Sequence, residues 1–290
     1  MKRWAMVGSA LMLAWAVVTA EAEEPPLAPF PTAWEDPQGG PVDLSFLLEA
    51  PAGRDGFVTV RDGHLAEADG SRLRIWGINV SGAGGLPRQE DAPRLAAILA
   101  RHGLNGVRFH YFDRPAPGGV FRADGPDTRT PDPEQLDRLD LFVAELKKRG
   151  IYTNLNLNVA RQYRAGDGVR DHELLGFAKG LTHFDARLIE LQKEYARQLL
   201  THRNPYTGNE YRNEPAVAIV EMVNENSLVE SWFSDRLLGK NTRKNPGTWT
   251  DIPASYEREL TARYQVWLRE RVSSADLARL REEAGVGDAE

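Results

Sequence analysis

Two kinds of hydrophobic pattern alternate along this chain, and they predict a series of strands and helices. Short runs that are apolar throughout, or apolar at every second position, indicate strands, whereas apolar positions three and four apart indicate amphipathic helices. We expect strands at residues 57–60, 64–68, 72–80, 104–112, 151–159 and 216–226. We expect helices at residues 91–101, 133–149, 185–201 and 254–272, and a short last helix from a serine cap at 273 or 274 to residue 281.

The first strands are separated by short turns, which sets them apart from the later ones. Asp62-Gly63 and Asp69-Gly70 are strong signals for β-hairpin turns. The run at residues 72–80 is more continuously apolar and leads into a glycine-rich loop. We therefore expect it to leave the hairpin and to become the first strand of a larger sheet.

Strands and helices alternate from residue 72 onward, which predicts a parallel sheet with helices packed outside it. A doubly wound sheet and a (β/α)8 barrel both fit this alternation. A doubly wound sheet buries both faces under helices, whereas here polar side chains follow one face of the second, third and fourth strands. Polar groups near the carboxyl ends of strands are typical of a barrel interior. The sequence thus predicts an α/β fold, a (β/α)8 TIM barrel with about four βα units present and a small N-terminal β-hairpin.

Residues 216–226, AVAIVEMVNEN, carry the strongest chemical signal of the chain. Read as one extended strand, this run places Glu221 and Glu225 on the same face, and an unpaired carboxylate in an apolar run would be costly. Arg108 and His110, near the end of the second barrel strand, are suitable partners for them. A functional site and a structural ion-pair network are both compatible with this grouping.

Composition narrows the class of protein. The chain has 290 residues, of which 41% are hydrophobic and 27% charged, which is ordinary for a soluble globular protein. A formal net charge of −6 makes nucleic acid an unfavourable partner. Cysteine is absent, so disulfides cannot stabilise the fold.

The N-terminus reads as an export signal. Lys2 and Arg3 precede an apolar run at residues 5–18 and small residues at Ala20 and Ala22, which predicts a signal peptide over residues 1–22. The run is too short to cross a bilayer comfortably, so we expect no integral membrane span after cleavage, with a retained N-terminal anchor as the alternative. We expect a secreted or periplasmic protein, with a linker or extended arm at 23–55 and a catalytic barrel at 56–290.

Three segments resemble glycoside hydrolase clan A, the family 5 cellulase-like group. IVEMVNEN, at residues 219–226, resembles the fourth barrel strand of these enzymes, where an apolar strand with an internal Glu ends in Asn-Glu. NGVRFHYFD, at 105–113, resembles their second strand, and YQVWLRERVSSADLARL, at 264–280, is similar to a helical stretch of some β-galactosidase-like members. The resemblance spans most of residues 56–280, and the Asn-Glu strand is its sharpest motif.

The resemblance implies roles for particular residues. Glu225 would be the general acid/base, and Asn224 would hydrogen-bond the sugar 2-hydroxyl. Arg108 would keep the catalytic nucleophile ionised, and His110 would hydrogen-bond the substrate. Weaker candidates for sugar contacts are Asn158, Trp76, Tyr111 and Trp232.

The resemblance also implies a second carboxylate that this sequence does not supply. A retaining glycosidase needs one about 5–5.5 Å from the first, and the family places it at the end of the seventh strand. We therefore expect the nucleophile outside this chain, which would be the N-terminal part of a longer barrel. The function expected is that of a secreted retaining glycosidase acting on a β-linked glycan. The alternatives are a half-barrel that only binds carbohydrate, or a remnant, and a barrel lyase or isomerase.

Cofactor motifs are weak in this sequence. His172-Glu173 has Gly176 where a zinc-binding HExxH motif needs its second His. Gly82-Ala83-Gly84 has Pro87 in place of the third glycine of a dinucleotide-binding loop, which leaves such a site as a weak alternative. We expect no metal and no cofactor, and a carbohydrate as the partner.

Overall fold

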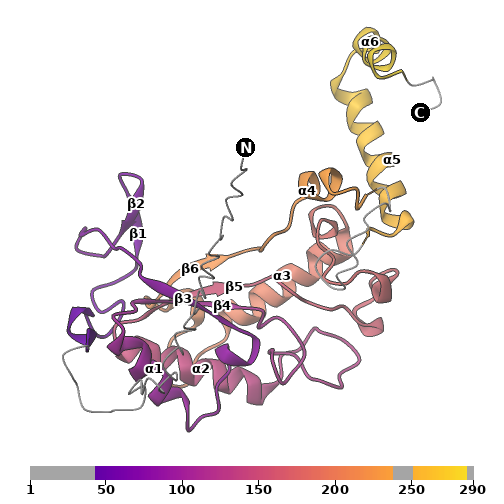
Figure 1. Ribbon diagram of the computed structural model, residues 1–290. Coiled ribbons are helices and arrows are strands. Elements are labelled where there is room, and N and C mark those ends of the chain that lie inside the picture. The colour runs from indigo at the N-terminus through magenta and orange to yellow at the C-terminus, as the bar shows by residue number, and fades with distance from the viewer. Residues whose placement is uncertain (1–42, 238–250, 286–290) are drawn as a thin grey trace, which may run out of the picture. The chain divides into compact units, whose positions relative to one another are not determined.

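The computed structural model describes residues 43–237 and 251–285 (Figure 1). The expected signal peptide at 1–22 and the arm up to residue 42 lie outside the described residues. Among the described residues, no helix combines the length and the hydrophobicity that a membrane span requires.

Four parallel strands form the central sheet, and they lie side by side in chain order. They are β3 (Gly77–Ser81), β4 (Gly106–His110), β5 (Tyr152–Asn156) and β6 (Val217–Glu221). Helices α1 (Ala92–Arg101), α2 (Pro133–Lys148) and α3 (Ala186–Thr201) connect them in turn. A doubly wound sheet reverses its strand order at a switch point, and this sheet does not. The expected barrel-type α/β fold with about four βα units is therefore confirmed for the part of the chain that the structure describes.

The outer face of the sheet holds the main hydrophobic core. Val107 and Phe109 of β4 and Leu155 of β5 are fully buried against side chains of α1, α2 and α3, among them Phe142 and Leu199. Figure 1 shows α1 and α2 together on one face of the sheet, and the two helices pack against each other. Full burial of one such side chain contributes about 1.5–3 kcal/mol, so this packing fixes the strand order.

The inner face of the sheet is polar at the level of the site. Asn79 of β3 is in register with Arg108 of β4, which is in register with Asn154 of β5. Side chains alternate between the two faces of a strand. Because Phe109 and Leu155 point outward into the core, their neighbours Arg108 and Asn154 point inward, and so does Asn79, which is in register with Arg108.

The predicted hairpin is present as β1 (Thr59–Arg61) and β2 (His64–Ala66). Asp62 and Gly63 form its two-residue turn, and both have positive φ, 48° and 77°, as a type I′ turn requires. After a bridge between Ala66 and Arg72, the chain leaves the hairpin to enter β3, as the sequence predicts.

Residues 43–55 lie against the amino ends of the strands. Ala52 is buried with Leu73, Tyr152 and Ala216, and its N–H donates to the Lys147 carbonyl (2.9 Å). The next residue, Gly53, has φ +69°, and a Cβ there would meet the carbonyl carbon of Pro215 at 2.5 Å. Only glycine fits this contact, which attaches the segment to the barrel.

The prediction that residues 216–226 form one buried strand is wrong in two respects, the length of the strand and its burial. Strand β6 stops at Glu221, and Glu225 has φ +44°, which is not extended backbone. The strand is half-exposed, with Val220 at 39% exposure, because β6 is an edge of the described sheet. Sequence alternation could not reveal this, since an edge and a central strand share the same pattern.

The C-terminal elements are three helices. No helix was expected between residues 227 and 253, but α4 (Leu228–Phe233) forms there, and Ser227 caps it by accepting a hydrogen bond from the Glu230 N–H (3.1 Å). The expected helices follow as α5 (Ala254–Arg271) and α6 (Ser274–Ala284). Short 3-10 helices complete the described structure at η1 (Ser45–Leu47), η2 (Gly82–Gly85), η3 (Ala165–Asp167), η4 (His172–Leu174), η5 (Leu181–His183) and η6 (Tyr211–Asn213).

Candidate active site

An arginine–glutamate pair is the centre of the polar inner face. Arg108 spans the width of β5 to reach Glu221, with Nε to Oε1 and Nη2 to Oε2 both at 2.7 Å. Hydrogen bonds from Arg108 are the main cause of a lowered pKa for the Glu221 carboxyl, and the same pair raises the pKa of Arg108. Glu221 is therefore ionised and held in a bidentate geometry, which fixes both side chains.

Two amides of β5 complete the surroundings of Glu221. Asn154 Nδ2 donates to its Oε1 (2.6 Å), and Asn156 Nδ2 donates to its Oε2 (2.8 Å). The polar face expected for this strand therefore meets polar partners. Asn158 differs, because β5 has ended by then: its side chain is buried, and its backbone carbonyl accepts the Asn224 N–H (3.0 Å).

Asn224 connects this pair to the candidate acid/base. Its Oδ1 accepts a hydrogen bond from Arg108 Nη2 (2.9 Å). A guanidinium can only donate, so the amide must present its oxygen to Arg108 and its NH2 group elsewhere.

Glu225 is exposed at the carboxyl edge of the sheet, next to Asn224. Hydrogen bonds with Glu221 raise the pKa of Arg108, and burial lowers the pKa of His110 and of Lys179. The charge of Glu225 acts upward on all three pKa values, so its carboxylate lies near these three groups. The backbone of Glu225 is also unusual. Its φ of +44° is uncommon for a residue with a side chain and costs about 1–3 kcal/mol. The structure thus brings Glu225, Asn224, Arg108 and His110 together, as predicted, although Glu225 reaches the site from a turn and not from the strand.

His110 lies between the arginine and the amides. Arg108 Nη1 lies 3.0 Å from its Nδ1, and Asn156 Nδ2 lies 3.5 Å from the same atom. Burial, followed by the charge of Arg108, lowers the pKa of His110. Because both neighbours are donors, Nδ1 is the acceptor and Nε2 carries the proton of a neutral ring.

Tyr111 follows with a positive φ of +61°, directly after β4 ends. Its ring contacts His110 edge-on at 4.6 Å between centroids and Phe177 at 6.0 Å. Tyr111 therefore belongs to the group of residues at this edge.

The two tryptophans predicted to contact sugar lie elsewhere. Trp76 precedes β3, and its backbone N–H donates to Asn105 Oδ1 (2.7 Å) at the amino end of the sheet. The five-residue strand β3 separates that end from the candidate site, so the structure does not bring Trp76 together with the other site residues. The hydrophobic pattern of residues 72–80 could not give the strand's true start, because the sheet begins only at Gly77.

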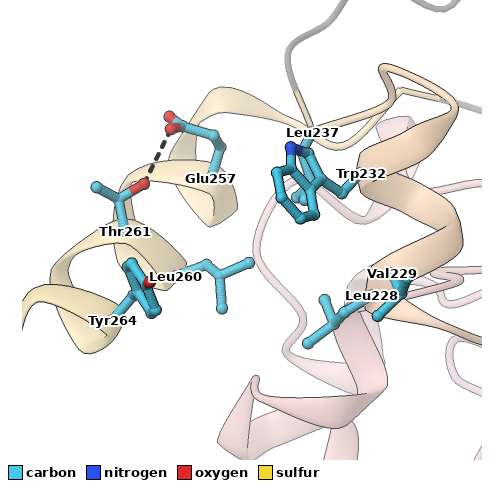
Figure 2. A pocket seen from close by; sticks show the side chains of 8 residues that line it. All are labelled: Leu228, Val229, Trp232, Leu237, Glu257, Leu260, Thr261 and Tyr264. Carbon is cyan, nitrogen blue, oxygen red and sulfur yellow. Dashed lines mark hydrogen bonds between the residues drawn. The ribbon is translucent and has the colours of Figure 1, made fainter. Parts of the chain in front are cut away.

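Trp232 lines an apolar pocket of about 460 Å3 between α4 and α5 (Figure 2). Aliphatic side chains make up half of the lining, and the hydrogen bond from Thr261 Oγ1 to Glu257 Oε1 (3.0 Å) is a polar element in its wall. The structure does not bring Trp232 together with the Arg108–Glu221 pair. The pocket is lined by Leu228, Val229, Trp232, Leu237, Glu257, Leu260, Thr261 and Tyr264.

The sequence analysis missed a buried lysine at the site. Lys179 is 4% exposed, and its Nζ donates to the Asn224 carbonyl oxygen. It lies in the loop between β5 and α3, where no periodic pattern or motif singles it out. Across the described residues, no group of three or more His, Cys, Asp or Glu side chains is placed to hold a metal ion.

Comparisons with known proteins give partial structural likenesses. No family model matches the chain, and no curated protein matches it. An endo-1,4-beta-mannanase from Rhizomucor miehei is 18% identical, with a TM-score of 0.46 over 59% of this chain and 48% of that one. A family 5 mannosidase from the same organism is 17% identical, with a TM-score of 0.44 over 63% and 52%.

A family 5 glycoside hydrolase from Bacteroides vulgatus is 13% identical, with a TM-score of 0.42 over 65% of this chain and 38% of that one. Solved structures of family 5 hydrolases are thus among those similar to this chain, as the sequence resemblance predicts. The chain spans about half the length of the Rhizomucor enzymes.

Proposed function

We propose that this protein is a glycoside hydrolase that acts on a β-linked glycan, with Glu225 as its general acid/base. One observation carries the proposal: an exposed carboxylate at the carboxyl edge of a barrel-type sheet lies next to an amide that a partly buried ion pair orients. Catalytic groups of barrel enzymes lie at this edge. In the first step Glu225 would give its proton to the leaving glycosidic oxygen, and in the second it would take a proton from water.

Asn224 would position the sugar. With its Oδ1 on Arg108, the Nδ2 group is directed away from the guanidinium and can donate to the 2-hydroxyl of the bound sugar ring. Hydrogen bonds to that hydroxyl strengthen in the oxocarbenium-like transition state. Arg108 and Glu221 then serve to orient Asn224 and do not themselves react.

Glu221 is an unsuitable nucleophile. Its two oxygens already accept four side-chain hydrogen bonds of 2.6–2.8 Å from Arg108, Asn154 and Asn156. An attack on the anomeric carbon would require breaking them. We therefore propose a retaining mechanism in which a carboxylate outside the described residues is the nucleophile, and export of the protein by the signal at residues 1–22.

The test compares the complete enzyme, which includes the carboxylate nucleophile, with its Glu225→Gln variant on soluble β-mannan and β-glucan. We expect hydrolysis to fall about 10²–10⁴-fold, as for loss of a general acid/base, while the affinity for an oligosaccharide measured by calorimetry stays within about twofold. Glu190→Gln, at a carboxylate of α3 that is 65% exposed, is the matched control and should keep full activity. Unchanged turnover in Glu225→Gln would refute the assignment.

A carbohydrate-binding protein without activity is the second candidate. The engagement of Glu221 favours it, because this leaves Glu225 as the free carboxylate of the group described above. Binding of oligosaccharide in both proteins, with hydrolysis in neither, would support this candidate over the enzyme.

A further inference from the structure

The turn that carries Glu225 is held on both sides by a loop 45 residues earlier in the chain. Lys179 Nζ donates to the carbonyl oxygen of Asn224, the residue before Glu225. The Gly180 N–H donates to Asn226 Oδ1 (2.5 Å), and Asn226 Nδ2 donates to Thr182 Oγ1 (2.5 Å) on the other side. Residues 179–182 therefore hold the backbone immediately before Glu225 and the side chain immediately after it.

His183 extends this attachment. Its Nε2 lies 2.9 Å from the backbone carbonyl oxygen of Asn226, an acceptor, so the ring nitrogen is protonated in this contact. The loop segment from Lys179 to His183 includes the 3-10 helix η5, whose Leu181 is buried in a hydrophobic cluster with Phe184. The segment that contacts the turn at Glu225 is therefore itself anchored in a hydrophobic cluster.

Burying the ammonium of Lys179 costs desolvation free energy, which the packing of its side chain alone does not offset. Its side chain is 4% exposed, and burial lowers its pKa, while the charges of Asp113 and Glu225 raise it. A desolvated ammonium needs acceptors and opposite charges around it. The Asn224 carbonyl and these two carboxylates supply them, and of the three groups Glu225 is exposed to solvent.

The backbone at Glu225 explains why such holding is needed. A φ of +44° is disfavoured for a residue with a Cβ, and it persists where the surrounding structure fixes it. Without the contacts at Asn224 and Asn226, the turn is free to relax to an ordinary conformation and to redirect the carboxylate.

We propose that Lys179 is a positioning residue for Glu225: together with Gly180 and Thr182 it fixes the left-handed turn at Glu225 and so aims the carboxylate into the site. The catalytic consequence rests on the proposed function, whereas the holding of the turn does not. Lys179 acts through Glu225 and touches no reacting atom.

Lys179→Met is the variant that tests this, because it keeps the length of the side chain and removes the ammonium. Lys193→Met, at a surface lysine paired with Glu190, is the matched control. Backbone amide hydrogen exchange over residues 222–228 is the first readout, and we expect it to be roughly tenfold faster in Lys179→Met and unchanged in Lys193→Met. The second readout is kcat on a β-linked substrate, which we expect to fall about 100-fold, the effect of a displacement near 1 Å, with KM within about twofold.

Each outcome decides the proposal. Unchanged exchange at 222–228 would overturn it, and faster exchange with an unchanged kcat would make Lys179 a structural residue only. Faster exchange in a protein whose wild type hydrolyses no glycan would leave the holding of the turn established and the proposed function refuted. If Lys179→Met does not fold, Thr182→Val removes the hydroxyl that accepts from Asn226 and must give the same two changes.

Discussion

Replacing Glu221 by Gln tests whether the ion pair at the centre of the site stabilises the fold. The carboxylate accepts two hydrogen bonds from Arg108 and one each from Asn154 and Asn156. A glutamine offers one acceptor oxygen and places an NH2 group where the second oxygen was. Two of the four hydrogen bonds are therefore lost, and the two N–H groups that made them then face the NH2 group of the glutamine, which cannot accept.

The magnitude follows from these contacts. A hydrogen bond to a charged group contributes about 1.5–3 kcal/mol. The Glu221 side chain is 27% exposed, so water partly replaces the lost partners and the lower end of this range applies. For two bonds we expect the free energy of unfolding to fall by about 3 kcal/mol.

Urea denaturation followed by tryptophan fluorescence measures this change. Glu190→Gln is the control, because Glu190 and its partner Lys193 are 65% and 60% exposed, and we expect less than about 0.5 kcal/mol there. A loss below about 1 kcal/mol in Glu221→Gln would show that water satisfies the arginine equally well, which would refute the reasoning.

The same pair predicts a pH dependence with a defined sign. Arg108 lowers the pKa of Glu221 below 4.5 in the folded protein, so the unfolded chain takes up the proton first as the pH falls. Its contribution to stability is present above pH 4.5 and is lost as the pH falls through the lowered pKa. The difference in stability between wild type and Glu221→Gln should therefore shrink on acidification, and a constant difference down to pH 3 would contradict this.

Three further predictions concern the neighbours of this pair. Arg108→Lys keeps the charge but loses the bidentate geometry, so we expect the free energy of unfolding to fall by about 2 kcal/mol in urea denaturation. Burial is the main reason why the pKa of His110 is lowered below 6.5, so the unfolded chain binds this proton first as the pH falls. The stability of the wild type should therefore fall below about pH 6.5, and that of His110→Asn should fall less. Thermal melts at several pH values measure this difference. Gly53→Ala should cost about 2 kcal/mol or more in thermal melts, because its Cβ would lie 2.5 Å from Pro215, whereas Gly208→Ala, with φ +77° but open space around it, should cost about 1 kcal/mol.

Much of the fold was predictable from local pattern. The hairpin turn at Asp62-Gly63 and the helices from 91 to 201 follow from residue types that have few alternatives, glycine at positive φ and apolar stripes at helical spacing. The inward direction of Arg108 and Asn154 was also predictable, because apolar residues alternate with polar ones along each strand and the apolar side faces the core.

The ends of strands and the contacts between distant loops were not predictable. β6 stops at Glu221 although the apolar pattern continues, since a strand lasts only as long as a neighbour pairs with it, and β6 is an edge of the described sheet. For the same reason the long strand expected at 72–80 placed Trp76 in the sheet, when β3 begins after it.

By itself the sequence determined the order of strands and helices, the polar inner face and the choice of Asn224 and Glu225, because each of these depends on residues close together in the chain. Only the tertiary structure decided that Glu221 pairs with Arg108, that Glu225 has a left-handed backbone conformation, and that Lys179 donates to the carbonyl of the preceding residue, Asn224. Those contacts join residues 45 and more positions apart, and no local preference encodes them. They arise when packing of the helices on the sheet brings the carboxyl ends of the strands to one edge.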